Sequence, residues 1–458
     1  MQLFRAANLY ADYDPTVPVY RVTPHREPAV HRFFDTCPTS PSGRYLAVTT
    51  LPFQWRRPAP GTKAAVDVID LETGERVFRA ITAAWDQDLG AQVQWGASDR
   101  DLFFNDMDLK TWMPFGLHVD PLIDRSVRLD GPVYMVSPDG RYSITPCLRR
   151  MTLVQPGHGV VVPKLEGLRQ DGASAEDGVF GTDHQTGRTG VLVSFADVAS
   201  AAPDVFARYR GKAGGFYGAH AQWNPQQTRI LFVMRWLPSG PRAVPDDPVL
   251  VTFDTDGRNI RVALDARHWP GGNGFAAWAR DGEHIVTTSL SRRGDPVLRA
   301  LDGFLGASSR LVRDRIGIDP AYQSRLSVPR FTSVRFDGAQ RRFLAPDLIG
   351  SGRPTLGPDD RVLLADSDPD DSLSTGDGTG LIRLVDLKRG VDHQVVRMRM
   401  GAGTTRSGAS FHPSHPVWDR TGDHVVFKGC PHGIRQVFIA DMRRVLAERH
   451  DVKARSWM

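Results

Sequence analysis

The sequence lacks long apolar segments and a secretory signal. No stretch approaches about 18 uncharged apolar residues, so we expect no membrane-spanning helix. Residues 1–14 contain no apolar core followed by small residues, which is the pattern of a leader peptide. We therefore expect a cytoplasmic protein that does not contact membranes, or a periplasmic one if a leader has been removed.

Cysteine is also scarce. The chain has three cysteines, Cys37, Cys147 and Cys430, which are far apart and lack the spacing of a zinc site. An odd number at such distances argues against a disulfide framework. A reducing compartment fits this composition best.

The common catalytic signatures are absent, and so is a large excess of charge of one sign. We find no Gly-x-Ser-x-Gly elbow, no His-Glu-x-x-His, no Walker phosphate loop and no dinucleotide fingerprint. The 57 Lys and Arg residues are scattered among 52 Asp and Glu, with a formal net charge of +5. This argues against a nucleic-acid partner, and the small positive excess could attract an anionic small molecule or oligosaccharide.

The sequence does contain one phrase repeated seven times. Each copy is an apolar strand, a four-residue turn and a second strand rich in Val, Ile, Leu and Phe. The turns begin at Ser40, Gly96, Ser137, Asn224, Ala279, Gly357 and Asp419. The residue before the turn is tryptophan in four copies, Trp95, Trp223, Trp278 and Trp418. Such a large ring could pack between two sheets.

A second apolar phrase ending in Asp or a turn follows each first one, for example residues 68–74 in the first unit and 298–303 in the fifth. Two hairpins per unit make the four-stranded antiparallel blade of a propeller, which protects its sheet edges by radial closure. The sequence therefore predicts an all-β fold, a single seven-bladed β-propeller domain over residues 1–458. Residues 18–22 are predicted to supply the fourth strand of the last blade and to close the ring.

The repeat also predicts which residues meet at the propeller axis. The first strand of each blade lines the central channel, so residues just before it converge at one mouth. Four places before each turn stand Thr36, Gln92, Val133, His220, Phe275, Arg353 and His415. We expect Gln94, Tyr134, Tyr217, Gln222, Arg235 and His412 close by. A few polar groups among apolar walls are typical of a ligand pocket.

These residue types fit β-elimination beside a uronic acid. That reaction needs a positive group at the carboxylate and a base for the proton α to it. Arg353 or Arg235 could bind the carboxylate in bidentate fashion. The predicted base is His220 or His415, and the predicted acid is Tyr134 or Tyr217. The predicted substrate-binding residues are Arg235, Arg353, Gln92, Gln94, Gln222 and His412.

Structural roles remain open for the same residues. Ordered water at the axis would account for His220 and His415. Arg235 could form a structural ion pair, and Tyr134 could serve packing alone. The acidic side chains Asp366, Asp368, Asp370, Asp371 and Asp377 could bind Ca²⁺ or belong to a solvated loop.

Three segments carry a family resemblance: Gly-Ala-His220-Ala-Gln-Trp-Asn-Pro, Gly-Arg353-Pro-Thr-Leu-Gly-Pro-Asp-Asp and Ser-His415-Pro-Val-Trp-Asp-Arg-Thr-Gly. They resemble TolB-like propellers and, among these, the oligogalacturonate lyase-like group, which includes ulvan and rhamnose-glucuronate lyases. The resemblance implies a histidine-rich Mn²⁺ site. Here Phe275 and Arg353 stand at comparable places, which leaves His220, Gln222, His412 and His415 and puts the metal in doubt.

Together, these observations predict a carbon-oxygen lyase that cleaves an anionic oligosaccharide next to a uronic acid. The alternative is a non-catalytic TolB-like propeller that binds a protein or a glycan at the channel mouth, because a fold does not imply a function.

Overall fold

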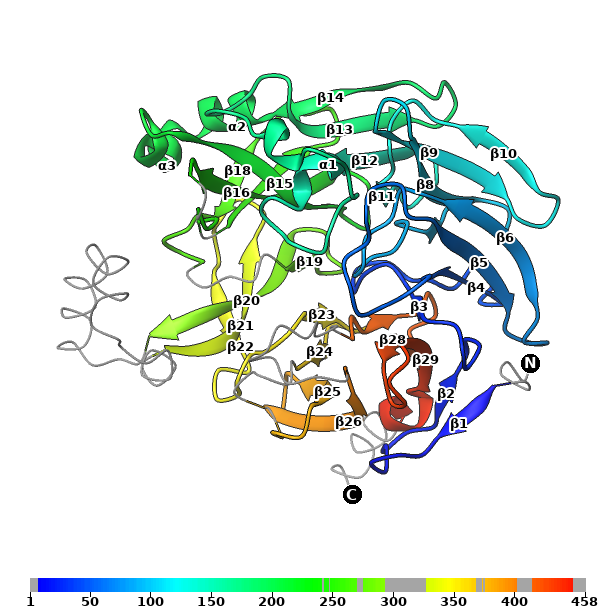
Figure 1. Ribbon diagram of the computed structural model, residues 1–458. Helices are drawn as coiled ribbons and strands as arrows, with labels where there is room; N and C mark the ends of the chain where they lie inside the picture. Colours follow the sequence, from blue (N-terminus) through cyan, green and yellow to red (C-terminus); the bar gives the residue numbers. More distant parts are fainter. Residues whose placement is uncertain are drawn as a thin grey trace.

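The protein forms a ring of seven antiparallel sheets, as predicted (Figure 1). The computed structural model describes residues 7–240, 243–246, 248–269, 275–292, 327–367, 373, 375–401 and 414–447. Six of the sheets have four strands and the seventh has five. Within each of the six, the strands follow one another in chain order, so every blade is an up-and-down meander.

The blades have the following strands. Blade 1 contains β3 (Ala29–Val30), β4 (Tyr45–Thr50), β5 (Ala64–Asp70) and β6 (Arg76–Thr82). Blade 2 contains β7 (Gln94–Trp95), β8 (Leu102–Asp108), β9 (Met113–Asp120) and β10 (Arg125–Arg128). Blade 3 contains β11 (Met135–Val136), β12 (Tyr142–Pro146), β13 (Gly178–Asp183) and β14 (Thr189–Ser194). Blade 4 contains β15 (Gly214–Trp223), β16 (Arg229–Pro238), β17 (Val249–Asp254) and β18 (Arg261–Leu264).

The remaining blades complete the ring. Blade 5 contains β19 (Ala276–Trp278), β20 (His284–Arg292), β21 (Ser327–Arg335) and β22 (Arg342–Leu344). Blade 6 contains β23 (Thr355–Leu356), β24 (Val362–Asp366), β25 (Thr379–Asp386) and β26 (Val391–Arg399). Blade 7 contains β27 (Val417–Trp418), β28 (His424–Gly429), β29 (Gln436–Asp441), β2 (Val19–Arg21) and β1 (Asn8–Tyr10).

The described helices are short and lie in connections between strands, within blade 3 or between blades 3 and 4. They are α1 (Leu148–Met151), η1 (Leu165–Leu168), α2 (Phe195–Ala201), α3 (Pro203–Phe206) and η2 (Ala207–Tyr209). None of the helices in the described ranges is long and apolar enough to cross a membrane.

The repeated tryptophans join neighbouring blades. The indole Nε1 of Trp95 donates to Pro38 O at 2.9 Å, that of Trp223 to Met135 O at 3.3 Å, and that of Trp278 to Gln222 O at 3.2 Å. Each acceptor belongs to the innermost segment of the preceding blade. The ring thus fills the space between two sheets while its N–H satisfies a buried carbonyl, which explains why the repeat favours tryptophan.

The predicted closure of the ring is confirmed. The N-terminal β2 pairs antiparallel with the C-terminal β29, with Val19 opposite Ala440 and Arg21 opposite Phe438, and Figure 1 shows β1 and β2 beside β28 and β29. Val19 is fully buried among side chains of blades 6 and 7. The two ends of the chain therefore share one sheet.

We expect this closure to protect backbone amides from exchange with solvent. Val22 N donates to Val437 O at 3.1 Å and Asp441 N donates to Pro18 O at 2.9 Å. Hydrogen exchange followed by mass spectrometry should show slow exchange in peptides that contain Val22, and fast exchange at the exposed Asp12. Equally fast exchange at both places would mean that β2 is detached in solution.

One predicted element is wrong. The second hairpin of the fifth unit was expected around residues 298–303, which lie outside the described residues, and the structure forms this hairpin from β21 and β22 instead. Many residues separate the two hairpins of blade 5, so the second hairpin comes later in the sequence than the repeat predicts. The spacing of apolar residues alone could not distinguish this connection from a strand.

Candidate active site at the propeller axis

The polar residues predicted from the repeat meet at one end of the axis. The turns of the repeat join the first strand of each blade to its second strand, at one end of the propeller axis. The segments that enter the first strands therefore lie at the other end of the axis. The connections between second and third strands reach that same end. Residues 31–36, which follow β3 within blade 1, bring Phe33 to the axis. The Phe33 ring packs against the rings of His158, His220 and His415, at centroid distances of 5.9, 5.6 and 4.7 Å.

His220 and Tyr134 form a buried hydrogen-bonded pair. The hydroxyl of Tyr134 lies 2.9 Å from His220 Nδ1. The other ring nitrogen, Nε2, is 3.5 Å from Asp35 Oδ2 and has no hydrogen bond within the described part of the chain. A shift in β-strand register between Gly218 and His220 locally changes the direction of β15, as bulges near active sites often do. We refer to Asp35, His220 and Tyr134 as the His220 relay, in which His220 and Tyr134 are hydrogen-bonded and Asp35 lies beside the imidazole.

Arg32 holds the relay in place. Its Nη1 binds Asp35 Oδ1 at 2.8 Å and contacts the Thr36 hydroxyl, and its Nε donates to Gln92 Oε1 at 3.2 Å. The guanidinium lies 4.7 Å from the centre of the Tyr134 ring. Thr36 and Gln92, both predicted at the axis, therefore orient Arg32.

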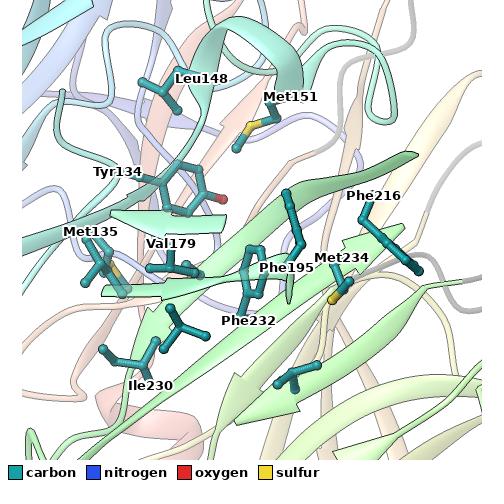
Figure 2. Packing of buried hydrophobic residues seen from close by; sticks show 14 of the residues in the cluster. Tyr134, Met135, Leu148, Met151, Val179, Phe195, Phe216, Ile230, Phe232 and Met234 are labelled. Carbon is teal, nitrogen blue, oxygen red and sulfur yellow. The ribbon is translucent and has the colours of Figure 1, made fainter. Parts of the chain in front are cut away.

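Burial keeps both members of the pair neutral near pH 7. It lowers the pKa of His220 to about 4, although Asp35 opposes the shift. Burial also raises the pKa of Tyr134, with Arg32 acting in the opposite direction. The imidazole can therefore accept a proton and the phenol can donate one. Figure 2 shows the Tyr134 ring close to Leu148 and Met151, so packing and hydrogen bonding both fix it.

A second group of polar residues comes from blades 6 and 7. The Lys428 ammonium lies 2.7 Å from His415 Nδ1 and donates to Asp88 O at 2.7 Å. Arg353 is ion-paired with Asp366 at 2.8 Å and lies over the ring of Phe275 at 4.9 Å. The predicted axis positions in blades 5, 6 and 7 therefore lie close to Phe33, whose ring packs against those of Phe275 and His415.

Two axis residues have unusual backbones. Gln92 and His415 occupy the same place in the repeat, and both have positive φ, 59° and 46°. A left-handed conformation costs a non-glycine residue about 1 kcal/mol or more. Such strain is concentrated at functional sites, which supports a role for this ring beyond packing.

Other predicted site residues point elsewhere. The Tyr217 hydroxyl accepts a hydrogen bond from Gln170 N at 2.8 Å, and Arg235 contacts Asp246 O at 3.5 Å. Gln94 Oε1 accepts from Val136 N at 2.7 Å and Gln222 Oε1 from Trp278 N at 3.3 Å, so each amide bonds to the next blade. These contacts place the four side chains in structural hydrogen bonds, outside the His220 relay. His412 lies outside the described residues.

The sequence prediction missed several axis residues, namely His31, Arg32, Asp35, Asp86, Asp88, His158, Lys428 and Arg435. A second fixed position in the repeat would have identified one of these residues, Lys428. Nine places after each turn begins stand Thr49, Asn105, Pro146, Val233, Thr288, Asp366 and Lys428, most of them polar inside an apolar strand. His158 has no such signal, because the irregular segment after α1 carries it to the axis.

Comparisons with known proteins identify the fold. No protein-family model matches the chain, and no curated protein matches its sequence. An oligogalacturonate lyase solved with manganese has a TM-score of 0.59 and 14% identity, over 96% of both chains. An oligogalacturonate lyase from Vibrio parahaemolyticus has a TM-score of 0.58 and 13% identity, over 96% of this chain and 97% of that one. At such identities the likeness confirms the seven-bladed fold and no more.

The described axis residues do not fit a manganese ion. Nowhere in the described ranges do three or more His, Cys, Asp or Glu side chains come together as metal ligands. His415 Nδ1 contacts the Nζ of Lys428 at 2.7 Å, so this ring nitrogen already has a partner. We therefore derive no chemical step through a metal.

The acidic segment considered for Ca²⁺ gives no support either. Asp368, Asp370 and Asp371 lie outside the described residues. Asp366 is buried and accepts from Arg353 and Ser414. Asp377 is bonded to neighbouring threonines and to Arg397.

Proposed function

We propose that this propeller is a carbon-oxygen lyase that cleaves an anionic oligosaccharide beside a uronic acid. The observation that carries the proposal is the Asp35, His220 and Tyr134 relay at the axis. It joins a neutral base to a protonated phenol, the two groups that β-elimination requires. The full-length likeness of the fold to oligogalacturonate lyases is consistent with this chemistry.

The relay can carry the reaction without net loss of a proton. His220 Nε2 takes the proton α to the carboxylate, and Asp35 stabilises the imidazolium that forms. The electrons of the C–H bond form the new C=C bond as the C–O bond to the leaving sugar breaks. Tyr134 protonates the leaving oxygen and regains a proton from His220 Nδ1.

A non-catalytic propeller that binds a glycan or a protein is the second candidate. Burial favours it, because His220 is 1% exposed and Tyr134 is fully buried. A uronate could reach them only if neighbouring side chains move. In this case the relay would be a structural network that fixes blades 1, 3 and 4 at the axis.

A direct assay separates the two functions. The protein is incubated with a panel of uronate oligosaccharides, and the ultraviolet absorbance of an unsaturated uronate is followed. We expect absorbance to rise with at least one substrate. If no uronate in the panel is cleaved, the binding function is favoured.

The pH dependence of the rate tests the base. His220 must be unprotonated to accept a proton, and burial lowers its pKa to about 4. The acidic limb of kcat/KM should therefore fall near pH 4, well below the value for an ordinary histidine of about 6.5. A limb near pH 6.5 would indicate a solvent-exposed histidine as the base instead.

A further inference from the structure

Two buried basic side chains at the axis form no salt bridge in the described part of the chain, although the charges of Asp86 and Asp88 act on both. Lys428 is 2% exposed and Arg435 is 1% exposed, yet neither forms a salt bridge with a described residue. The other buried arginines differ. Arg32 is paired with Asp35, Arg353 with Asp366 and Arg383 with Asp392. Because an unpaired buried charge costs several kcal/mol, this exception calls for an explanation.

Arg435 keeps one edge of its guanidinium unbonded. Nη1 donates to Gln87 O at 2.6 Å, whereas Nε and Nη2 have no hydrogen-bond partner among the described residues. The Nε and Nη2 donors form the side of the fork that binds both oxygens of a carboxylate. The carbonyl of Gln87 therefore fixes the guanidinium in a position where that edge remains available.

Lys428 makes His415 a donor. Lys428 Nζ lies 2.7 Å from His415 Nδ1, and when it donates there the ring proton of His415 lies on Nε2. Burial lowers the pKa of Lys428 well below its usual value, and a bound anion would favour its charged form. His415 is fully buried, and within the described ranges its Nε2 has no partner. The charges of Lys428 and Arg435 also both act on His31, which places them in one cluster. The unbonded groups of Arg435 and His415 are donors, and the Lys428 Nζ lies beside His415.

We propose that Lys428, Arg435 and His415 form an anion site that binds the carboxylate of an acidic sugar. Arg435 would hold both carboxylate oxygens, His415 would donate from Nε2, and Lys428 would supply the second positive charge. The choice of a sugar as ligand rests on the proposed function, while the anion site rests on these three side chains alone. The site adjoins Phe33, whose ring also packs against His220.

Binding of a sugar that cannot be cleaved tests this site independently of catalysis. Galacturonate, which has no glycosidic bond to break, is titrated while the melting temperature and the heat of binding are measured. Galactose serves as the neutral control, and sulfate and phosphate are added at matched ionic strength. We expect saturable stabilisation by galacturonate and none by galactose.

Three variants identify the residues responsible. Lys428→Met should weaken galacturonate binding by about thirtyfold or more, and Arg435→Lys, which keeps the charge but loses the fork, should also weaken it. Arg383→Met removes an equally buried arginine of blade 6 and should leave binding unchanged. In addition, Lys428→Met should raise the melting temperature of the ligand-free protein, because it removes an unpaired buried charge.

The outcomes are distinct. Undiminished binding in Lys428→Met and Arg435→Lys, or no saturable binding of any oxyanion to the wild type, overturns the site. Binding of sulfate or phosphate but not galacturonate overturns the carboxylate assignment. A drop in the ligand-free melting temperature of Lys428→Met would show that Lys428 serves only to anchor Asp88 O. Binding without any lyase activity would instead contradict the proposed function and leave the anion site standing.

Discussion

Replacement of His220 by alanine is expected to lower kcat/KM on a uronate oligosaccharide by about 10²–10⁴-fold. The change removes the base and leaves Asp35 and Tyr134 without the group that links them. Tyr134→Phe should also reduce the rate, because it keeps the ring that packs under Arg32 and deletes only the hydroxyl that protonates the leaving oxygen. The measurement is the initial rate of unsaturated uronate formation.

His184→Ala is the matched control for this experiment. His184 is a half-buried histidine that stacks on Phe103 between blades 2 and 3, with ring centroids 4.5 Å apart, and it does not contact the relay. Its loss should leave kcat/KM nearly unchanged even if stability falls. Full activity in both His220→Ala and His415→Ala would remove every base that the sequence nominated.

The fold is expected to lose several kcal/mol of stability between pH 7 and pH 4. Burial lowers the pKa of His158 and of His220 to about 4, and it also lowers the pKa values of His31 and His415 well below their usual value. Below pH 6.5 the unfolded chain therefore binds protons that the folded chain does not. The free energy of unfolding decreases as the pH is lowered. Each shift to about 4 corresponds to roughly 3 kcal/mol once the pH is below both values.

Several carboxyls act in the opposite direction, namely those of Asp67, Asp86, Asp177 and Asp360, whose pKa values are raised by burial. Burial raises the pKa of Asp86 well above its usual value, so its protonation would favour the folded chain as the pH falls. Four hydrogen bonds to its oxygens, from Leu89 N, Asp88 N, Gly159 N and Gln92 Nε2, favour the ionised form. We expect these bonds to limit the opposing contribution.

Urea unfolding at pH 7.5 and pH 4.5 isolates the histidines. His158→Gln and His220→Gln should each reduce the loss between these two pH values by about 2–3 kcal/mol, since glutamine does not titrate. His25→Gln, at an exposed position, is the control. If the loss were the same in all variants, the buried histidines would not be responsible for the acid sensitivity.

The repeat could be recognised in the sequence because the first hairpin of every blade packs in the same way over a short stretch of chain. A turn, an apolar strand and a tryptophan that reaches the preceding blade recur whatever lies in the connections. The same local rule placed Gln92, His220, Arg353 and His415 at the axis. It failed for Gln94 and Gln222, because an amide that bonds to the next blade has the same sequence position as one that faces a ligand.

The sequence by itself therefore determined the number of blades, the closing strand and the ring of axis positions. Only the tertiary structure decided which side chains pair across that ring. Asp35, Tyr134 and His220 come from three blades, and Lys428 meets Asp88 over 340 residues of chain. Periodicity records which face of a strand is buried. It does not record which partner from another blade satisfies a buried charge, and that pairing decides whether an axis residue is structural or available to a ligand.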